Sequence, residues 1–203
     1  MRKFVITSLV VGLMVGISTI ASANLLTNPG FETNDLSGWT EDWADIYVSY
    51  FDPPPSATGG SYYAKTSHSG GRYQNVSVIP LQVYTISAET YVPSGGSATL
   101  WGTYVKVEWL DASLAPIGGT AWEVIAQNLT RDQWNITSGD TPPAPPTAAF
   151  AQIKFGTYAS GGTPATPTGF DNLDFAPIPE PSTMLLLGTG LFGLAGLVVK
   201  KKK

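Results

Sequence analysis

The central part of the chain alternates short apolar runs with turn-forming Gly, Pro, Ser and Asn residues. Short runs rich in Val, Ile, Tyr, Phe and Trp between such residues are typical of β-strands. We expect strands at residues 46–51, 61–66, 73–78, 83–92, 98–111, 122–126, 134–137, 150–158 and 170–175. No window has the period of an amphipathic helix, so the pattern predicts an all-β, antiparallel β-sandwich over residues 24–177.

Alternation along these strands assigns side chains to two faces, because successive residues of a strand point to opposite sides of the sheet. Val105, Val107 and Trp109 share one face, and Lys106 and Glu108 share the other. The same rule over the other strands gives the expected core: Tyr84, Ile86, Val105, Val107, Trp109, Ile153, Phe155, Leu173 and Phe175.

The N-terminal 23 residues have the order of a secretory signal peptide: basic residues, an apolar run over residues 4–20, and small residues at a cleavage site. Ala21 and Ala23 form the A-x-A site, so we expect a signal helix that is removed by cleavage before Asn24. An uncleaved membrane anchor is the alternative. In either case the Sec export machinery is an expected partner.

The C-terminal end carries a second apolar run, residues 183–199, followed by four Lys residues. As a helix this run would barely cross a bilayer, and the Lys cluster should stay cytoplasmic, which leaves the middle domain outside. Before the run lie Pro179, Glu180, Pro181 and Ser182. An ordinary transmembrane anchor is one interpretation of residues 178–203.

The Pro-Glu-Pro triplet, the Leu/Gly-rich run and the basic end together resemble the PEP-CTERM sorting domain of Gram-negative bacteria. This resemblance implies an exosortase as partner, which processes the chain near the triplet. It also implies an inner-membrane-anchored precursor that is later released to the cell surface or outside the cell.

Charge narrows the set of partners for the middle domain. Between residues 24 and 179 there are five basic and fourteen acidic residues, so nucleic acid should be repelled and divalent cations are the more plausible charged partners. The chain has no Cys and one His, His68, which leaves no thiolate or His-rich metal site. His68 is expected to be an exposed loop residue.

The segments at the two ends of the middle domain, residues 24–32 with Gly38-Trp39 and residues 169–173, are similar to galactose-binding-like jelly rolls that include many carbohydrate-binding modules. The resemblance implies that the first and last strands lie close together and share a structural Ca²⁺. It places Glu32 and Asp171 as ligands, supplemented by backbone carbonyls near Asn28 and Gly30. Alternatively, both carboxylates only accept hydrogen bonds in turns.

Carbohydrate binding would need exposed aromatic rings with polar neighbours. The candidates by strand parity or loop position are Glu89, Tyr91, Tyr104, Glu108, Trp43 and Tyr50. Packing of the sandwich core is the competing role for the Trp residues. Residues 41–45 are interpreted as a solvated acidic loop.

No spacing singles out a pair of catalytic carboxylates, and no nucleophile or phosphate-loop motif is present. We therefore expect a non-catalytic surface or matrix protein that is structural or associates with polysaccharide. A carbohydrate-binding module with a defined ligand and a glycoside hydrolase are the alternatives.

Overall fold

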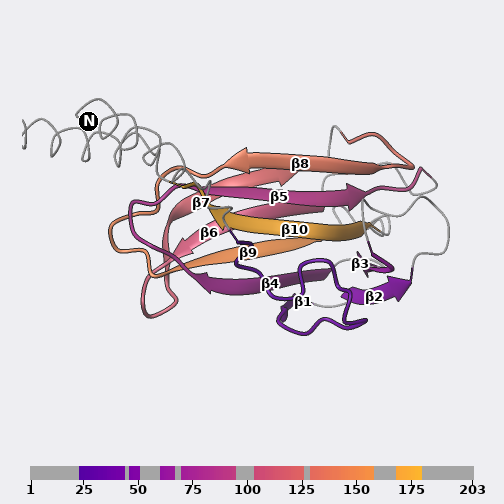
Figure 1. The fold of residues 1–203 in the computed structure, drawn as a ribbon, viewed down its shortest axis with the longest axis horizontal. Helices are drawn as coiled ribbons and strands as arrows, with labels where there is room; N and C mark the ends of the chain where they lie inside the picture. The colour runs from indigo at the N-terminus through magenta and orange to yellow at the C-terminus, as the bar shows by residue number, and fades with distance from the viewer. Residues whose placement is uncertain are drawn as a thin grey trace, which may run out of the picture. The chain divides into compact units, whose positions relative to one another are not determined.

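The computed structural model describes residues 23–43, 46–50, 60–66, 70–94, 103–125, 129–157 and 168–179. Within them, the side chains of residues 43, 47–50, 124 and 125 are not described. Residues Ala23–Ile178 form one compact unit. In it, two five-stranded antiparallel sheets pack face to face, so the β-sandwich expected from the sequence is confirmed (Figure 1).

The strands alternate between the two sheets along much of the chain. Sheet A has the order β1-β4-β9-β6-β7 and sheet B the order β2-β3-β10-β5-β8. The strands of sheet A are β1 (Thr40–Trp43), β4 (Gly70–Ser77), β9 (Phe150–Thr157), β6 (Thr103–Leu110) and β7 (Pro116–Ile125). Those of sheet B are β2 (Ile46–Tyr50), β3 (Tyr62–Thr66), β10 (Gly169–Pro177), β5 (Tyr84–Tyr91) and β8 (Trp134–Asp140).

The core lies between the sheets, and strand parity identified its centre. All nine expected residues are at most 4% exposed, including Trp109 at 4%. An aromatic group extends this core: Phe155 contacts Phe170, Phe31 and Trp39, with ring centroids 4.9, 5.7 and 5.0 Å away. Burying such rings is among the larger favourable terms in folding a domain of this size.

The N-terminal segment runs beside the last strand, as the jelly-roll resemblance implied. Asn24 donates its amide to the Leu173 carbonyl at 2.8 Å and accepts the Phe175 N–H at 3.1 Å. The Leu25 N–H donates to the Phe175 carbonyl at 2.8 Å, and the Leu173 N–H to the Pro29 carbonyl at 3.1 Å. These bonds satisfy backbone groups of β10 that no neighbouring strand reaches.

Two expectations about local structure were wrong. Glu41 and Asp42 do not lie in a solvated loop but on edge strand β1, where their carboxylates bind Arg72 of β4 and Lys154 of β9. Strand β7 begins at Pro116, before the expected residue 122, because an edge strand tolerates the Pro and Gly residues that normally end one.

The segments expected to form the signal helix and the helix of residues 183–199 lie outside the described residues, as does His68. Within the part of the chain that the structure describes, no helix has the length and apolarity needed to cross a bilayer.

Candidate functional site

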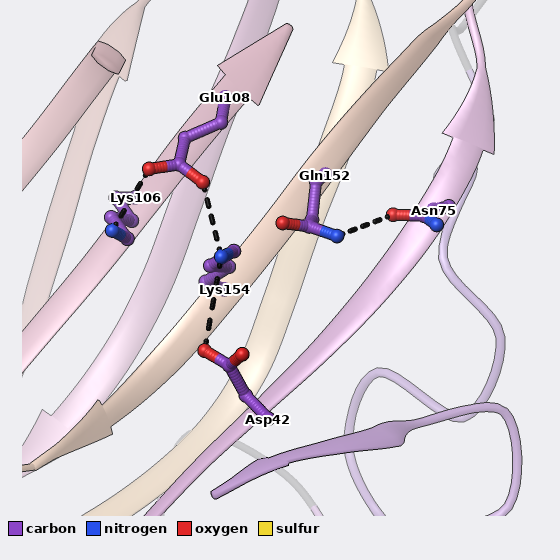
Figure 2. A network of polar contacts seen from close by, with 6 residues as sticks. All are labelled: Asp42, Asn75, Lys106, Glu108, Gln152 and Lys154. Atoms are coloured by element: carbon purple, nitrogen blue, oxygen red, sulfur yellow. Dashed lines mark hydrogen bonds and ion pairs between the residues drawn. The ribbon is translucent and has the colours of Figure 1, made fainter. Parts of the chain in front are cut away.

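The outer face of sheet A carries a set of connected polar side chains from four strands, which we call the network face (Figure 2). Parity directs alternate residues of β6 and β9 outward there, opposite the buried core residues of the same strands. The members are Asp42 of β1, Asn75 of β4, Lys106 and Glu108 of β6, and Gln152 and Lys154 of β9.

Glu108 is the centre of the network. One carboxylate oxygen lies 2.9 Å from the Lys106 ammonium and the other 3.1 Å from that of Lys154. Lys154 also lies 3.8 Å from Asp42. Beside this chain, Gln152 donates to Asn75 at 3.0 Å. The four charged side chains are 15 to 32% exposed, so they reach solvent while being held by each other.

The electrostatics of the network keep Glu108 ionised. Burial alone would raise the pKa of this carboxyl, but hydrogen bonds and charges from Lys106 and Lys154 outweigh it and the pKa is lowered. Two lysines face two carboxylates, which leaves the network face without net charge. It offers hydrogen-bond donors and acceptors rather than a charged surface.

Tyr104 lies on the same face but is only 4% exposed, so the expectation of an exposed ring was wrong. The reason is the absence of side chains beside it: Tyr104 is opposite Gly156, which is opposite Gly71. A methyl group at position 156 would lie 2.9 Å from the Tyr104 hydroxyl oxygen. The ring therefore leans over the glycine, with the Lys106 ammonium 5.5 Å from its centroid.

A second candidate site is the terminal junction, where the N-terminal segment meets β10: Gly30, Glu32, Glu89, Asp171 and Asn172. A bulge in β10 between Asp171 and Asp174 sets its geometry, with Asn172 in the left-handed region at φ 45°. The Asn172 N–H donates to one Asp171 oxygen at 2.8 Å, and its side-chain amide donates to Glu89 at 3.3 Å.

Asp171 is fully buried, and its Oδ2 has no hydrogen-bond partner among the described residues. Burial raises the pKa of this carboxyl to about 8, and the charges of Glu89 and Glu32 add to the rise against the Asn172 N–H. A buried carboxylate oxygen without a partner is costly, so the site favours a proton or a cation there.

Glu32 has a different role from Asp171. Its carboxylate accepts the backbone N–H groups of Ser61 at 2.9 Å and of Tyr62 at 3.0 Å, which fixes the start of β3. The Asn28 carbonyl accepts the Trp39 indole N–H at 3.1 Å. No three Asp, Glu or His side chains of the described residues are grouped closely enough to hold a metal ion by themselves.

The outer face of sheet B holds three partly exposed aromatic side chains, the aromatic cluster: Tyr63 of β3, Tyr91 of β5 and Trp134 of β8. The Trp134 ring lies 5.6 Å from Tyr63 and 5.6 Å from Tyr91, and Gly169 makes room beneath them. Burial, then the charge of Asp132, raises the pKa of Tyr91.

The structure thus divides the carbohydrate candidates between two faces. Tyr104 and Glu108 lie on sheet A, and Tyr91 and Glu89 on sheet B. Glu89 is only 6% exposed, because it lies opposite Asp171 of β10 at the bulge. The expectation that Glu89 contacts a ligand directly was therefore wrong. Trp43 belongs to β1 and Tyr50 to β2, and the side chains of both lie outside the described part.

Sequence reasoning missed the other members of the network face. Their signal was present, since Lys106, Gln152 and Lys154 share the outward parity of Glu108 on expected strands. The order of the strands was unknown, so their meeting was not foreseen. Of the processing sites, Ala23, Asn24 and Pro179 are described, while Ala21, Glu180, Pro181 and Ser182 lie outside the described residues.

Comparison with protein families bears on the C-terminal end. Residues 177–202 match the PEP-CTERM protein-sorting motif. The match confirms the resemblance seen in the sequence and indicates an exported, membrane-anchored precursor that an exosortase sorts to the cell surface. No curated protein matches the chain.

Solved structures resemble the sandwich. TmCBM61 in complex with β-1,4-galactotriose is 19% identical, with 77% of this chain and all of that one covered, at a TM-score of 0.53. The CBM22-1 xylan-binding domain of Paenibacillus barcinonensis Xyn10C is 16% identical, with 81% of this chain and all of that one covered, at a TM-score of 0.50.

An enzyme is also among the structural neighbours. The enzymatically active domain of bacteriophage CBA120 tailspike protein 4 is 14% identical, with 76% of this chain covered and a TM-score of 0.60. This chain spans only 21% of the tailspike domain. At such identities the likeness establishes the fold alone, a β-sandwich of the kind found in carbohydrate-binding modules.

Proposed function

We propose that this chain is a non-catalytic surface protein whose jelly-roll sandwich associates with extracellular polysaccharide through the network face. The observation that carries the proposal is the row of paired, partly exposed polar side chains across β6, β9, β4 and β1. Sugars are bound by fixed donors and acceptors that match their hydroxyl groups. Neighbours solved with β-1,4-galactotriose or described as xylan-binding support this choice of ligand class.

The electrostatics favour a neutral, hydroxyl-rich ligand. Because Glu108 and Asp42 balance Lys106 and Lys154, a uronic acid or a phosphate would meet as much repulsion as attraction. Prearranged side chains also lose little rotamer freedom when a ligand binds.

Glycan binding by the full chain tests the proposal. Gln152→Ala and Lys154→Ala should each weaken binding about 5-fold to 100-fold, the usual loss for a removed side-chain hydrogen bond to a ligand. Asp140→Asn on β8, an exposed polar change on the other sheet, is the control and should leave affinity unchanged. Binding that is insensitive to both network variants would exclude this face.

The aromatic cluster is the second candidate face, for a module with a defined glycan. The three rings from neighbouring strands could stack on sugar C–H groups. Tyr91→Ala discriminates the two faces: loss of binding in this variant, with Gln152→Ala unaffected, would assign recognition to sheet B. A glycan array on the full chain would then identify the ligand.

A glycoside hydrolase is supported less well. Such an enzyme needs an accessible carboxylic acid with a raised pKa beside a second carboxylate. On the network face Glu108 has a lowered pKa because two lysines bind it. Asp171 has a raised pKa but no exposed surface, so a substrate could not reach it.

We further propose a structural Ca²⁺ at the terminal junction. The support is the buried Asp171 Oδ2, which has no partner among the described residues, next to the acidic Glu89 and Glu32. Asp171 would be a direct ligand, and the ion would supply the positive charge that the junction lacks. Ca²⁺ takes six to eight oxygens, so backbone carbonyls of the N-terminal segment and water would complete the shell.

Thermal unfolding with and without Ca²⁺ tests this site. For a Kd near 10 μM, about 1 mM Ca²⁺ would add roughly 2.7 kcal/mol to the unfolding free energy. Asp171→Ala should abolish the increment, whereas Asp140→Ala should keep it; Glu32→Ala removes a nearby negative charge and should weaken the increment. If EGTA and added Ca²⁺ both leave the melt of metal-free protein unchanged, the calcium proposal is wrong and the polysaccharide proposal stands.

A further inference from the structure

Both ends of the folded unit leave the sandwich at one end, which we call the exit end; it is the left-hand end in Figure 1. Pro177 pairs with Tyr84 at the last rung of sheet B, and the Ile178 N–H donates to the Val83 carbonyl at 2.9 Å. The N-terminal Asn24 binds the backbone of Phe175 nearby. The hydrophobic sorting segment therefore continues directly from this end.

Three loops cover the exit end: residues 78–83, 111–115 and 141–149. The Leu81 N–H donates to the Ala144 carbonyl at 2.8 Å, which joins the first loop to the third. The Ala149 N–H donates to the Leu110 carbonyl at 2.9 Å, beside the second loop. The loops thus form one continuous surface around the point where the chain leaves.

Apolar side chains project from this surface into solvent. Ile79 is 66% exposed, Leu81 67% and Leu114 50%. Asp111 is the one charged residue in the three loops, and its carboxylate is bound to the backbone of Ser113 and Ala115. Apolar residues on loop tips with so little charge around them do nothing for folding in water.

The backbone makes two of these residues more unusual. Leu81 has φ 67° and Leu114 has φ 64°, the left-handed region that favours Gly or Asn. Leu81 follows Pro80 in a turn closed by the Gln82 N–H on the Ile79 carbonyl, and Leu114 closes the hairpin between β6 and β7. A leucine in such a position adds strain and here buries at most half of its surface, so stability gives little reason for either residue.

We propose that the exit end rests on the lipid bilayer while the precursor is anchored, with Ile79, Leu81 and Leu114 inserted into its interfacial region. From Ile178 to Thr183, where the apolar run begins, the chain can extend at most about 18 Å, so the anchor keeps this end close to the membrane. Apolar side chains gain free energy at that boundary, and a surface nearly without charge is not held back by hydration.

A second copy of the chain fits this surface less well. The three side chains stand on separate loop tips, whereas a stable dimer needs roughly 800 Å² of complementary surface from each partner. The bilayer is deformable and needs no matching shape. This inference rests on the match to the sorting motif and is independent of the proposed glycan binding.

Site-directed labelling tests the contact, and the absence of Cys from the chain makes single labels unambiguous. Leu81→Cys carries the environment-sensitive NBD fluorophore, with the full chain reconstituted in phosphatidylcholine vesicles that contain brominated acyl chains. We expect a blue-shifted emission that the bromine atoms quench. Ile136→Cys is the matched control, since Ile136 is 68% exposed but lies on the outer face of sheet B; its label should show neither change.

A second variant separates membrane contact from stability. Leu81→Asn with Leu114→Asn should keep or raise the melting temperature, because Asn tolerates the left-handed backbone, while an NBD label at Ile79→Cys loses its bromine quenching. The proposal would be overturned by equal quenching at positions 81 and 136. It would also be overturned by a label at position 81 whose emission is blue-shifted but not quenched, as expected for a dimer. Quenching that persists at position 79 in the double variant would overturn it as well.

Discussion

The network face and the terminal junction both gather carboxylates on outward positions of the sandwich, but they treat those charges in opposite ways. On the network face, Glu108 is held by two lysines and its pKa is lowered. At the terminal junction, Asp171 is fully buried beside other carboxylates and its pKa is raised to about 8. Exposure and partners, more than residue type, decide which carboxylate is a stable surface anion and which one requires a proton or a cation.

The largest expected effect is the dependence of stability on pH that Asp171 causes. Its folded-state pKa is raised to about 8 from the unfolded value of 3.8. Without metal, the stability that this carboxyl contributes by taking up a proton on folding is therefore complete below pH 4 and is lost as pH rises through about 8. At about 1.4 kcal/mol per pKa unit, the loss is on the order of 5 kcal/mol. Chemical denaturation in EGTA across that range should show the decline.

Asp171→Asn should remove most of this pH dependence, because the amide cannot titrate. Burial also raises the pKa of Asp174, so this residue likewise makes stability fall as pH rises. It should account for the pH dependence that remains in the variant. A wild-type protein whose stability rises steadily from pH 4 to pH 8 in EGTA would contradict the raised pKa of Asp171.

An intermediate effect is expected beneath the network face. Gly156→Ala places a methyl group against the Gly70 carbonyl and 2.9 Å from the Tyr104 hydroxyl oxygen. Overpacking of this kind typically costs about 1 to 3 kcal/mol. Gly119→Ala on β7 is the control, since nothing lies within 4 Å of its added methyl group. Urea melts of the two variants should differ by that amount; equal stability would mean that Gly156 is not closely packed against β4 and Tyr104.

The smallest effect concerns the ion pairs themselves. Glu108→Gln removes the shared partner of two lysines that are 15 and 23% exposed, and should cost about 0.5 to 1 kcal/mol at low salt. Glu41→Gln, on a side chain that is 61% exposed, should cost less because water screens its pair with Arg72. Unfolding at low and high salt measures the stability loss of both variants. An equal loss for Glu41→Gln would mean that partial burial does not strengthen the ion pairs of the network face.

Much of the fold could be predicted because local alternation reports burial directly. Trp109 and Phe155 were placed in the core from the parity of their own strands. Phe31 was missed, and core packing of Trp39 was expected from its residue type alone, since both lie in a turn-rich segment without period and become buried only when that segment packs against Phe155. The acidic strand β1 was missed because its charges are neutralised by basic residues of other strands.

The sites depended on information that a single strand does not contain. Tyr104 had the outward parity of a ligand-binding ring, but a glycine on the adjacent strand leaves room for its hydroxyl end, and the ring is buried. The burial of Glu89 follows from its pairing opposite Asp171, in a register that the bulge of β10 interrupts. Both outcomes are set by which strands become neighbours, and alternation along the chain does not encode that order.

The hydrogen bonds of Asn24 constrain how the chain can mature during export. Its side chain binds Leu173 and Phe175, 149 and 151 residues later, and Phe31 meets Phe155 in the core. A chain that crosses the membrane N-terminus first cannot close this sandwich until almost all of the unit has emerged. In such a chain, the first residues of the unit would stay unfolded until the last strand has emerged. For a chain exported in this direction, folding would be completed only after the last strand has crossed the membrane.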